Sequence, residues 1–281
     1  MKTYLVPVDF SETSINAAKY AAALSHQTDV SHIILLNAYF VSVYETMLPS
    51  PDMVQLTEDD VEQNAADRIH KLEQLKNQLK KLVKPGVEIS IHLNRTHLLR
   101  AVIENTIAKK ADLVILGSSG NSSHDDTRIG SHVVKISKAS PVPVIVVPPA
   151  YNFEKVKRVV VAFDFNIITA TQPLEALQRL LNRKKAELLV INIDNNDHQE
   201  GDAEKAAKAS PLYDMLKEYQ PKYYYVNNDD VINGILQFAT ANDAQLVIAL
   251  PRKYSFFQSL LHNSVSQRLA ENSVAPVLLL K

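Results

Sequence analysis

The sequence predicts an α/β fold made of two tandem copies of one domain, each with a parallel sheet flanked by helices. Short β-branched runs alternate with segments of helical periodicity along the whole chain of 281 residues. Similar segments also recur in the same order in the two halves. The composition, 46% hydrophobic and 22% charged, is that of an ordinary globular protein.

The internal repeat consists of three matched pairs of segments. With the second copy given after the first, they are YLVPVDFS and RVVVAFDFN, ADLVILGSSG and AQLVIALPRK, and KASPVPVIVVP and ENSVAPVLLLK. Both members of the first pair contain an aspartate after an apolar run, Asp9 and Asp164. The other two pairs share one offset of 133 positions, as between Ala111 and Ala244. Matches in the same order indicate two copies of one domain.

Prolines in the stretch PPAYNFEK interrupt the pattern between the copies, so the predicted domains are residues 1–150 and 151–281. The second copy has a shorter middle section. The distance from Asp9 to Gly117 in the first copy is 108 positions, and the equivalent distance from Asp164 to Leu250 in the second copy is 86. The difference of 22 residues corresponds to residues 40–61, and the role of this insertion is left open.

The first elements of the N-terminal half follow from local signals. Residues 4–8 form an apolar run that predicts a buried strand. Ser11 is then a helix N-cap, and the helix that follows has apolar residues along one face. The run HIILLNAY predicts the second strand. Thr57 opens a long helix whose apolar residues recur at spacings of three and four, namely Val61, Ala65, Ile69, Leu72, Leu75, Leu79 and Leu82.

The remaining elements of this half alternate in the same way. The segment VEISIHL alternates strictly between apolar and polar residues and predicts a strand. The elements expected after it are a helix over 98–110, a strand over 113–116, a helix over 131–140 and a strand over 142–147. The second half is expected to repeat this order from Val159 to Leu280. Strands that alternate with helices imply parallel pairing with right-handed crossovers.

Charge and composition exclude several classes of partner and chemistry. The formal net charge is -1, so no overall field favours nucleic acid or an anionic membrane. The chain has no cysteine, which excludes disulfides, thiolate nucleophiles and cysteine metal sites. No segment approaches the roughly 20 apolar residues that span a bilayer. We expect a cytoplasmic protein that binds neither nucleic acid nor membranes.

One loop concentrates the chain's glycine. The stretch GSSGNSSHDDTRIGS, residues 117–131, holds three of the six glycines and joins a predicted strand to a predicted helix. Gly117 and Gly120 allow a tight turn and close approach of a ligand. At Gly130 and Ser131 the first amides of the helix lack partners and favour an anion such as phosphate. The alternative is a glycine-rich surface turn beside an ordinary helix cap.

The glycine spacing distinguishes between nucleotide motifs. It is not the dinucleotide fingerprint, and it lacks the lysine of a Walker A loop. Two residues and then nine residues separate the glycines, and this pattern resembles the motif of ATP-binding members of the universal stress protein family. The segments VPVDFSETS and IILLNAYF resemble that family's first two strands. The likeness covers nearly the whole chain and implies two Rossmann-like (adenine nucleotide alpha hydrolase-like) domains, each with a five-stranded parallel sheet.

The resemblance also implies a set of nucleotide-binding residues in the first domain. Asp9 approaches the ribose, and the backbone of Ala38 meets the adenine edge. The glycine loop and the start of the following helix hold the phosphates, mainly through backbone amides. The full set is Pro7, Val8, Asp9, Ala38, Leu116, Gly117, Gly120, Gly130, Ser131 and His132.

The implied cofactor is ATP, with or without Mg²⁺. Two acidic residues, Asp125 and Asp126, lie within the loop and would repel a triphosphate unless they face water or share a divalent cation. A solvated, charged loop tip is the simpler interpretation. No metal ligand set and no catalytic residue is assigned.

The second domain has lost the motif. At the repeat offset, the three glycines are replaced by Leu250, Lys253 and Asn263, and only Ser264 persists. Side chains therefore occupy positions where backbone has to approach a phosphate. We predict that this domain does not bind ATP in the manner of the family, so the chain has one nucleotide site.

The last strand of each half is a candidate edge strand, which requires a partner or protection. The resemblance implies pairing of these strands, and in a tandem chain the two halves can pair internally as a pseudo-dimer. Association of two chains into a homodimer is left open.

The predicted function is an ATP-binding, nucleotide-dependent regulatory or stress-response protein. The alternatives are a slow ATP hydrolase or other nucleotide-dependent enzyme of this fold, and an interaction protein that binds no nucleotide.

Overall fold

The computed structural model describes residues 2–40, 58–118, 131–149, 151–163, 165, 186–194, 201–208, 210–249 and 275–280. In the first half the described helices and strands are β1 (Lys2–Pro7), α1 (Glu12–Leu24), η1 (Ser25–Gln27), β2 (Val30–Ala38), α3 (Glu58–Leu79), β3 (Glu88–Asn94), α4 (Leu98–Ala108), β4 (Leu113–Gly117), α5 (Ser131–Ala139) and β5 (Val144–Val147). In the second half they are β6 (Arg158–Ala162), β7 (Glu187–Asp194), α7 (Asp202–Lys208), α8 (Pro211–Leu216), η2 (Lys217–Tyr219), β8 (Lys222–Asn227), α9 (Val231–Ala241), β9 (Leu246–Ala249) and β10 (Val277–Leu279).

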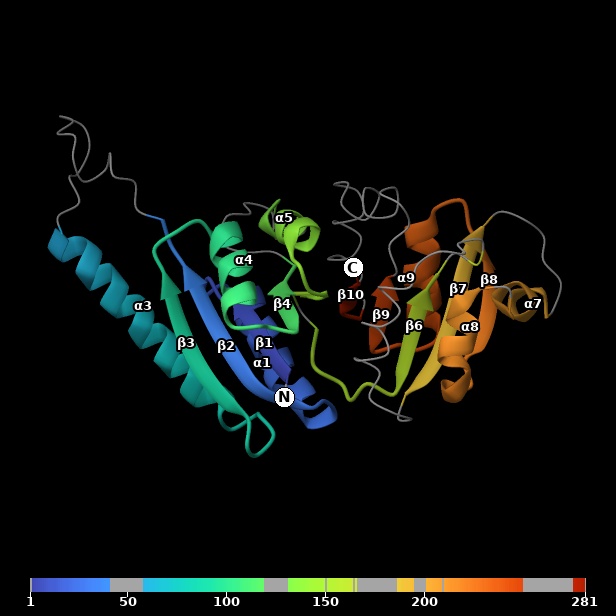
Figure 1. Cartoon of the computed structure of the whole chain (residues 1–281), viewed down its shortest axis with the longest axis horizontal. Coiled ribbons are helices and arrows are strands. Elements are labelled where there is room, and N and C mark those ends of the chain that lie inside the picture. The colour runs from blue at the N-terminus through green and yellow to red at the C-terminus, as the bar shows by residue number, and fades with distance from the viewer. Residues whose placement is uncertain are drawn as a thin grey trace.

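The described strands form one continuous sheet across both halves (Figure 1). The order is β3-β2-β1-β4-β5-β10-β9-β6-β7-β8. Within each half all paired strands are parallel, and the two halves have the same order when each is followed inward from its outer edge. The predicted α/β class with two five-stranded parallel halves is therefore confirmed.

The two halves meet at an antiparallel pair formed by their last strands, β5 and β10. Ile145 pairs with Leu278, and these two residues occupy the same position in the two copies of the repeat. The neighbouring pairs are Val144 with Leu279 and Val146 with Val277, so the contacts exchange between copies as they do at a two-fold axis. The predicted internal pairing of the last strands is confirmed. We refer to this β5–β10 pair as the central seam.

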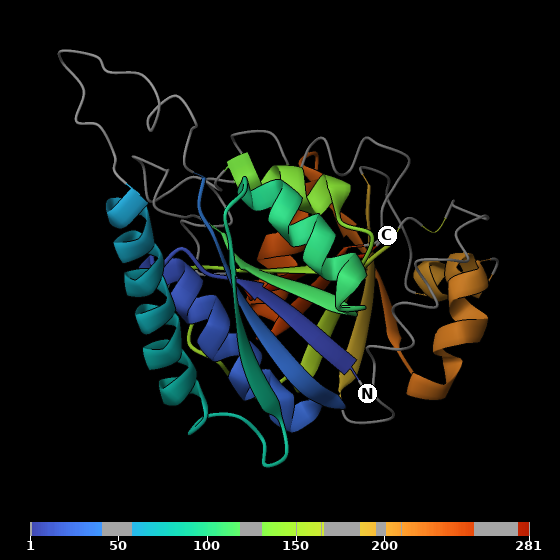
Figure 2. The ribbon, with the colours of Figure 1, turned by 60° about the vertical axis from the view of Figure 1, so that its left-hand side comes forward.

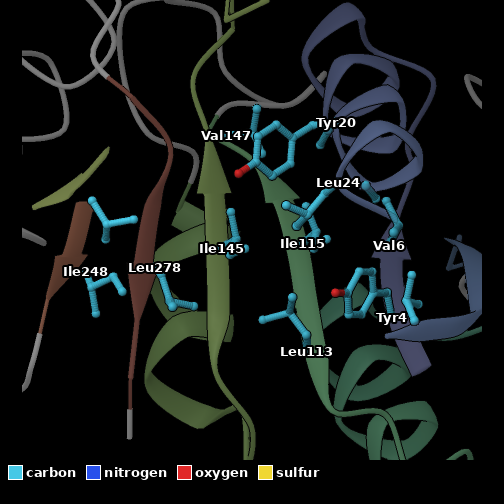
Figure 3. Packing of buried hydrophobic residues seen from close by; sticks show 14 of the residues in the cluster. Tyr4, Val6, Tyr20, Leu24, Leu113, Ile115, Ile145, Val147, Ile248 and Leu278 are labelled. Atoms are coloured by element: carbon cyan, nitrogen blue, oxygen red, sulfur yellow. The ribbon is translucent and has the colours of Figure 1, made fainter. Parts of the chain in front are cut away.

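Apolar layers on both faces of the sheet form the core. Helices lie over both faces (Figure 2). Alternate residues of a strand point to opposite faces, so Tyr4 and Val6 belong to one layer while Leu5 belongs to the other. In the first half, α1 and α3 cover the first face, and α4 and α5 cover the second. Figure 3 shows Tyr20 of α1 in the layer that continues across the central seam to Leu278.

The helices of the two halves differ after their second strands. Among the described residues, the first half has the long helix α3 of 22 residues, which contains the predicted apolar positions from Val61 to Leu79. The predicted position Leu82 lies beyond its end and is exposed. In the second half the short helices α7 and α8 lie between β7 and β8. Pro211 begins α8 at the first helical position, where its missing N–H is tolerated, and it cannot continue a helix from the preceding segment.

The segment between the halves is bound to α1. The side-chain amide of Asn16 donates to the carbonyl oxygens of Pro148, Pro149 and Tyr151 at 3.0–3.2 Å. Further along α1, the ring of Tyr20 packs edge-on against those of Tyr151 and Phe153. The connection between the halves is therefore packed against the first half over its described length.

Two glutamine side chains fix the later part of the same segment. Gln27 exchanges two hydrogen bonds with the backbone of Val156, at 2.8 and 3.1 Å. In the second half, Oε1 of Gln245 accepts from the backbone N–H groups of Lys157 and Arg158. The segment is thus hydrogen-bonded to both halves.

None of the helices that the structure describes combines the length and apolar character needed to cross a bilayer. The cytoplasmic location expected from the sequence stays a prediction.

Candidate functional site

The candidate site lies where β1 and β4 stop pairing near their carboxyl ends. The last pair between them joins Leu5 to Val114, although β1 continues to Pro7 and β4 continues to Gly117. The direction of strand succession reverses here, because β2 lies on one side of β1 and β4 on the other. Open α/β sheets bind ligands at such a switch point, beyond the carboxyl ends of the strands.

Proline at position 7 accounts for the end of this pairing. The N–H of Val8 donates to the carbonyl oxygen of Leu36 in β2 at 2.8 Å. Since successive backbone nitrogens of a strand point to opposite neighbours, the nitrogen of Pro7 faces β4, and it carries no hydrogen. Pro7 therefore removes the donor that would extend the ladder toward β4, and it does so at the predicted site.

Asp9 follows β1 and organises the start of α1. Its Oδ1 accepts hydrogen bonds from the backbone N–H of Ser11 at 3.0 Å and from the Ser11 hydroxyl at 2.6 Å. The Ser11 hydroxyl in turn accepts from the N–H of Ser14, which confirms Ser11 as the N-cap of α1. Phe10, between Asp9 and Ser11, has a φ of 67°, the left-handed conformation that turns the chain sharply from strand to helix.

The second side of the site is formed by the end of β4. Gly117 lies against the first turn of α1, and a Cβ built on it would be 2.7 Å from the carbonyl oxygen of Thr13. That distance is too short for any side chain, so packing within the chain already requires glycine here. Packing therefore explains the glycine at position 117 without any ligand. The role predicted from the sequence, close approach of Gly117 to a ligand, stays a prediction.

Two buried polar atoms lie at the end of β4 and in the first turn of α5. Ser118 is 3% exposed, and its hydroxyl has no hydrogen-bond partner in the part of the chain that the structure describes. The same holds for Nδ1 of His132, the second residue of α5. Leaving a buried polar atom unpaired costs about 1–3 kcal/mol, so such atoms in a folded protein require an explanation.

A buried asparagine supports the other side of the site. Asn37 of β2 is fully buried, and its amide donates to the carbonyl oxygen of Val8 at 2.6 Å. Its Oδ1 accepts from Nη1 of Arg68 in α3 at 3.1 Å, and the Arg68 guanidinium lies 4.8 Å from the ring centre of Tyr39. Every polar atom of the Asn37 amide thus has a partner, and the network holds the backbone that follows β1.

The remaining predicted residues lie at the same edge of the sheet. Leu116 is buried in β4 and paired with Val146, so its side chain serves the core. Ala38 is the last residue of β2 and is partly buried. Ser131 begins α5, where the backbone is described. The fold therefore places these residues and those of β1 at one edge of the sheet, and their role in binding a ligand stays a prediction.

Several sequence-based assignments lie outside the described residues. These are Gly120 and Gly130 of the glycine loop, the acids Asp125 and Asp126, and, in the second half, Asp164 and the replacements Leu250, Lys253, Asn263 and Ser264. In the described ranges, no three histidine, aspartate or glutamate side chains gather into a group that could hold a metal ion.

Sequence reasoning missed two residues of this region. Ser118 follows Gly117 directly, but only the folded chain shows that its hydroxyl is buried and unpaired. Asn37 interrupts the apolar run IILLNAY, and a polar residue at an inward position of a buried strand is the signal that could have identified it.

The fold and this edge define a class of protein: a tandem, doubly wound α/β protein with a candidate ligand site at the strand switch point of its first half. The sequence model of the universal stress protein family matches the chain twice, over residues 1–148 and 155–281. The chain therefore belongs to the universal stress protein family.

One relative and two solved structures show what the chain is similar to. Universal stress protein MJ0531 of Methanocaldococcus jannaschii is 24% identical over 147 residues, which are 52% of this chain and 81% of the relative. A universal stress protein structure from Archaeoglobus fulgidus DSM 4304 superposes with a TM-score of 0.68 at 16% identity and covers 99% of this chain and 96% of its own. The functionally unknown protein PA1789 from Pseudomonas aeruginosa PAO1 gives a TM-score of 0.54 at 15% identity, with 100% and 92% covered.

Proposed function

We propose that the first half binds ATP and that the chain acts as a nucleotide-dependent regulatory protein of the stress response. The observation that carries this proposal is the pair of buried, unpaired polar atoms, Ser118 Oγ and His132 Nδ1, at the end of β4 and the start of α5. Phosphate oxygens would accept hydrogen bonds from both, provided that the histidine carries its proton on Nδ1. A phosphate thus supplies the partners that these atoms lack among the described residues.

The position of these atoms supports an anion in particular. His132 lies in the first turn of α5, a helix of nine residues, and Ser118 directly follows β4. At a helix N-terminus the backbone amides point outward, and the helix dipole favours negative charge. The glycine pattern that precedes α5 in the sequence is of the kind that admits close approach of a phosphate to the backbone. The two features are independent, since one is a pattern in the sequence and the other is a burial pattern in the fold.

The remaining parts of the nucleotide follow from the neighbouring strands. We propose that the ribose lies by Asp9 and the adenine by Ala38, with Pro7 and Val8 beside it. Mg²⁺, if it accompanies the nucleotide, is held by phosphate oxygens in this proposal. The second half binds no ATP, because its loop carries bulky residues in place of glycine. The domains are residues 1–150 and 151–281.

The first test is the identity of the nucleotide. The purified full-length chain is denatured, and the released small molecules are separated and quantified against ATP, ADP and AMP standards. We expect about one adenine nucleotide per chain, either retained through purification or taken up when ATP is titrated calorimetrically. Absence of binding by the full-length chain in both measurements would refute the proposal.

Two serine variants then localise the phosphates. Ser118→Ala removes the buried hydroxyl at the end of β4, and we expect roughly tenfold weaker ATP binding, since hydrogen bonds to charged groups contribute about 1.5–3 kcal/mol. Ser137→Ala is the matched control, because Ser137 Oγ is also buried and without a partner in the described chain, but it lies further along α5. Equal affinities of the two variants would place the phosphates elsewhere.

A further inference from the structure

We infer that the ring of Phe40, stacked on His97, is a platform that holds the aromatic base of the bound nucleotide. This inference rests on the proposed function. It assigns a binding role to two residues that the glycine pattern does not involve, one after β2 and one before α4.

The two rings form a close stack. Their centroids are 4.0 Å apart and their planes differ by 20°. Phe40 follows β2, and His97 directly precedes α4. Phe40 is nevertheless 55% exposed, so the stack hides only part of its ring. An exposed aromatic ring that is already held in place by a second ring offers a ligand a flat apolar surface at little entropic cost.

The direction of the Phe40 side chain follows from the strand. The N–H of Tyr39 donates to the carbonyl oxygen of Asn94 at 3.0 Å, so the chain keeps its pairing with β3 one residue beyond Ala38. Residues two apart on a strand lie on the same face, which places Phe40 on the face of Ala38. Ala38 packs against the apolar layer that α4 covers, in agreement with the contact between Phe40 and His97.

The stack also lies within reach of the proposed phosphate position. Helices α4 and α5 cover the same face side by side, as seen in Figure 2, and both contribute to one apolar layer through Val102 and Ile136. Packed helices are about 8–10 Å apart, and α4 and α5 each follow a strand of the parallel sheet, so both begin at the carboxyl edge of the strands. A nucleotide with its phosphates at the start of α5 can therefore place its base at the start of α4.

Location separates Phe40 from the other exposed apolar side chains. Among the described residues, the other large ones are Ile69, Leu82 and Ile107, and single exposed side chains of this kind need no functional explanation. None of these three is an aromatic ring, and Ile107 lies near the far end of α4. Phe40 combines exposure, a stacking partner and a place at the carboxyl edge of the strands.

A stacking platform makes a specific claim about the ligand. Every base has a π-face, so stacking on Phe40 strengthens binding of nucleotides without choosing strongly among them, and a purine gains more contact than a pyrimidine. Inorganic tripolyphosphate has no base and gains nothing. Loss of the Phe40 ring should therefore weaken the binding of nucleotides and leave the affinity for tripolyphosphate unchanged.

The test compares ATP with inorganic tripolyphosphate on the full-length chain by calorimetry. We expect Phe40→Ala to weaken ATP about tenfold and to leave tripolyphosphate unchanged, while Phe40→Trp keeps ATP affinity within about twofold. Ile107→Ala is the control, since it removes an exposed apolar side chain from α4 at a distance from the stack. His97→Ala should weaken ATP by a smaller factor, because it frees the Phe40 ring without removing it. Circular dichroism checks that each variant is folded.

The outcomes separate the two proposals. If the unmodified chain binds ATP and Phe40→Ala binds it equally well, the platform is refuted and the proposed function stands. If Phe40→Ala weakens ATP and tripolyphosphate by the same factor, the ring supports the fold of the site and the platform is also refuted. If the unmodified chain binds neither molecule, the proposed function fails and the platform fails with it.

Discussion

Gly117 is the residue at which the fold gives a different reason from the sequence pattern. The pattern places it in a nucleotide loop, whereas the structure places it against the backbone of Thr13 in the first turn of α1. The contact joins residues more than a hundred positions apart, so the local sequence around Gly117 does not predict it. Glycine at this position is required by the approach of helix and strand whether or not a ligand binds.

This explanation predicts the effect of Gly117→Ala. The added Cβ would lie 2.7 Å from the Thr13 carbonyl oxygen, and backbone atoms cannot move away as a flexible side chain can. We expect a loss of roughly 1–3 kcal/mol in the free energy of unfolding, typical of overpacking, measured from the midpoint of urea denaturation.

Gly234→Ala provides the control for this measurement. The three atoms nearest to a Cβ at Gly234 would be side-chain atoms of Asn228 and Ile193, at 3.0–3.3 Å, and alanine gains helix propensity within α9. Its effect should be clearly smaller. A Gly117→Ala chain as stable as the unmodified protein would show that α1 adjusts easily and that the glycine has another purpose.

At the scale of elements, α1 connects the candidate site with the segment between the halves. Its first turn is capped by Ser11 and contacts Asp9 and Gly117, while Asn16 and Tyr20 further along bind the segment that leads to the second half. The helix is buried along most of one side. Its position therefore matters for both the site and the connection.

The pH dependence of stability should report on the tyrosine of this helix. Burial raises the pKa of Tyr20 above the ordinary value of 10.0, so the folded chain keeps a proton that the unfolded chain releases above pH 10. The contribution is complete below pH 10, and the free energy of unfolding falls as pH rises further, by up to about 1.4 kcal/mol per pH unit for one such group.

Tyr20→Phe should remove this part of the alkaline loss. At pH 7 we expect a change below about 1 kcal/mol, because the Tyr20 hydroxyl has no partner among the described residues and its removal leaves no atom unpaired. At pH 11 the variant should be the more stable protein by roughly 1 kcal/mol. Burial also raises the pKa of Tyr4 to about 12, so some alkaline loss remains in the variant. Urea denaturation at both pH values measures the difference, and parallel pH profiles would contradict the assignment.

The elements show how far sequence reasoning reaches. The strand of VEISIHL, the long helix with apolar residues from Val61 to Leu79, and the cap at Ser11 were predictable, because each depends on neighbours within one or two turns. The break that begins α8 at Pro211 has a local cause, but the sequence analysis expected only that the second half repeats the element order of the first with a shorter middle section. The position of the predicted residues at the carboxyl edge of the strands was predictable, because it follows from the order of strands and helices. The burial of Ser118 and the Phe40–His97 stack depend on contacts that only folding creates.

At the scale of the whole molecule, the central seam joins two halves that have the same strand order. Ile145 and Leu278 are equivalent residues that pair with each other, so the contact has the symmetry of a dimer within one chain. The side-chain hydrogen bonds of Gln27 and Gln245 to the connecting segment add to this junction. We therefore expect the halves to unfold as one cooperative unit.

The symmetry of the seam predicts the behaviour of the first half alone. A chain of residues 1–154 lacks β10 and exposes the edge of β5, which is fully apolar in the sequence VIVV. We expect two such chains to pair through their β5 strands, with Ile145 opposite Ile145. Sedimentation analysis should give a dimer for this fragment, and a substitution of Ile145 by lysine should convert it to a monomer. A monomeric unsubstituted fragment would show that the edge needs the particular side chains of β10.

Covalent fusion changes what the seam permits. In an assembly of two identical chains, any substitution at the contact appears twice and meets its own copy. Here Ile145 and Leu278 are encoded separately, so one partner can change while the other adapts to it. The two sides of the contact can therefore become complementary to each other without remaining complementary to themselves. A second copy of the chain would then have no strand edge to pair with at this place, and the two halves could diverge in function.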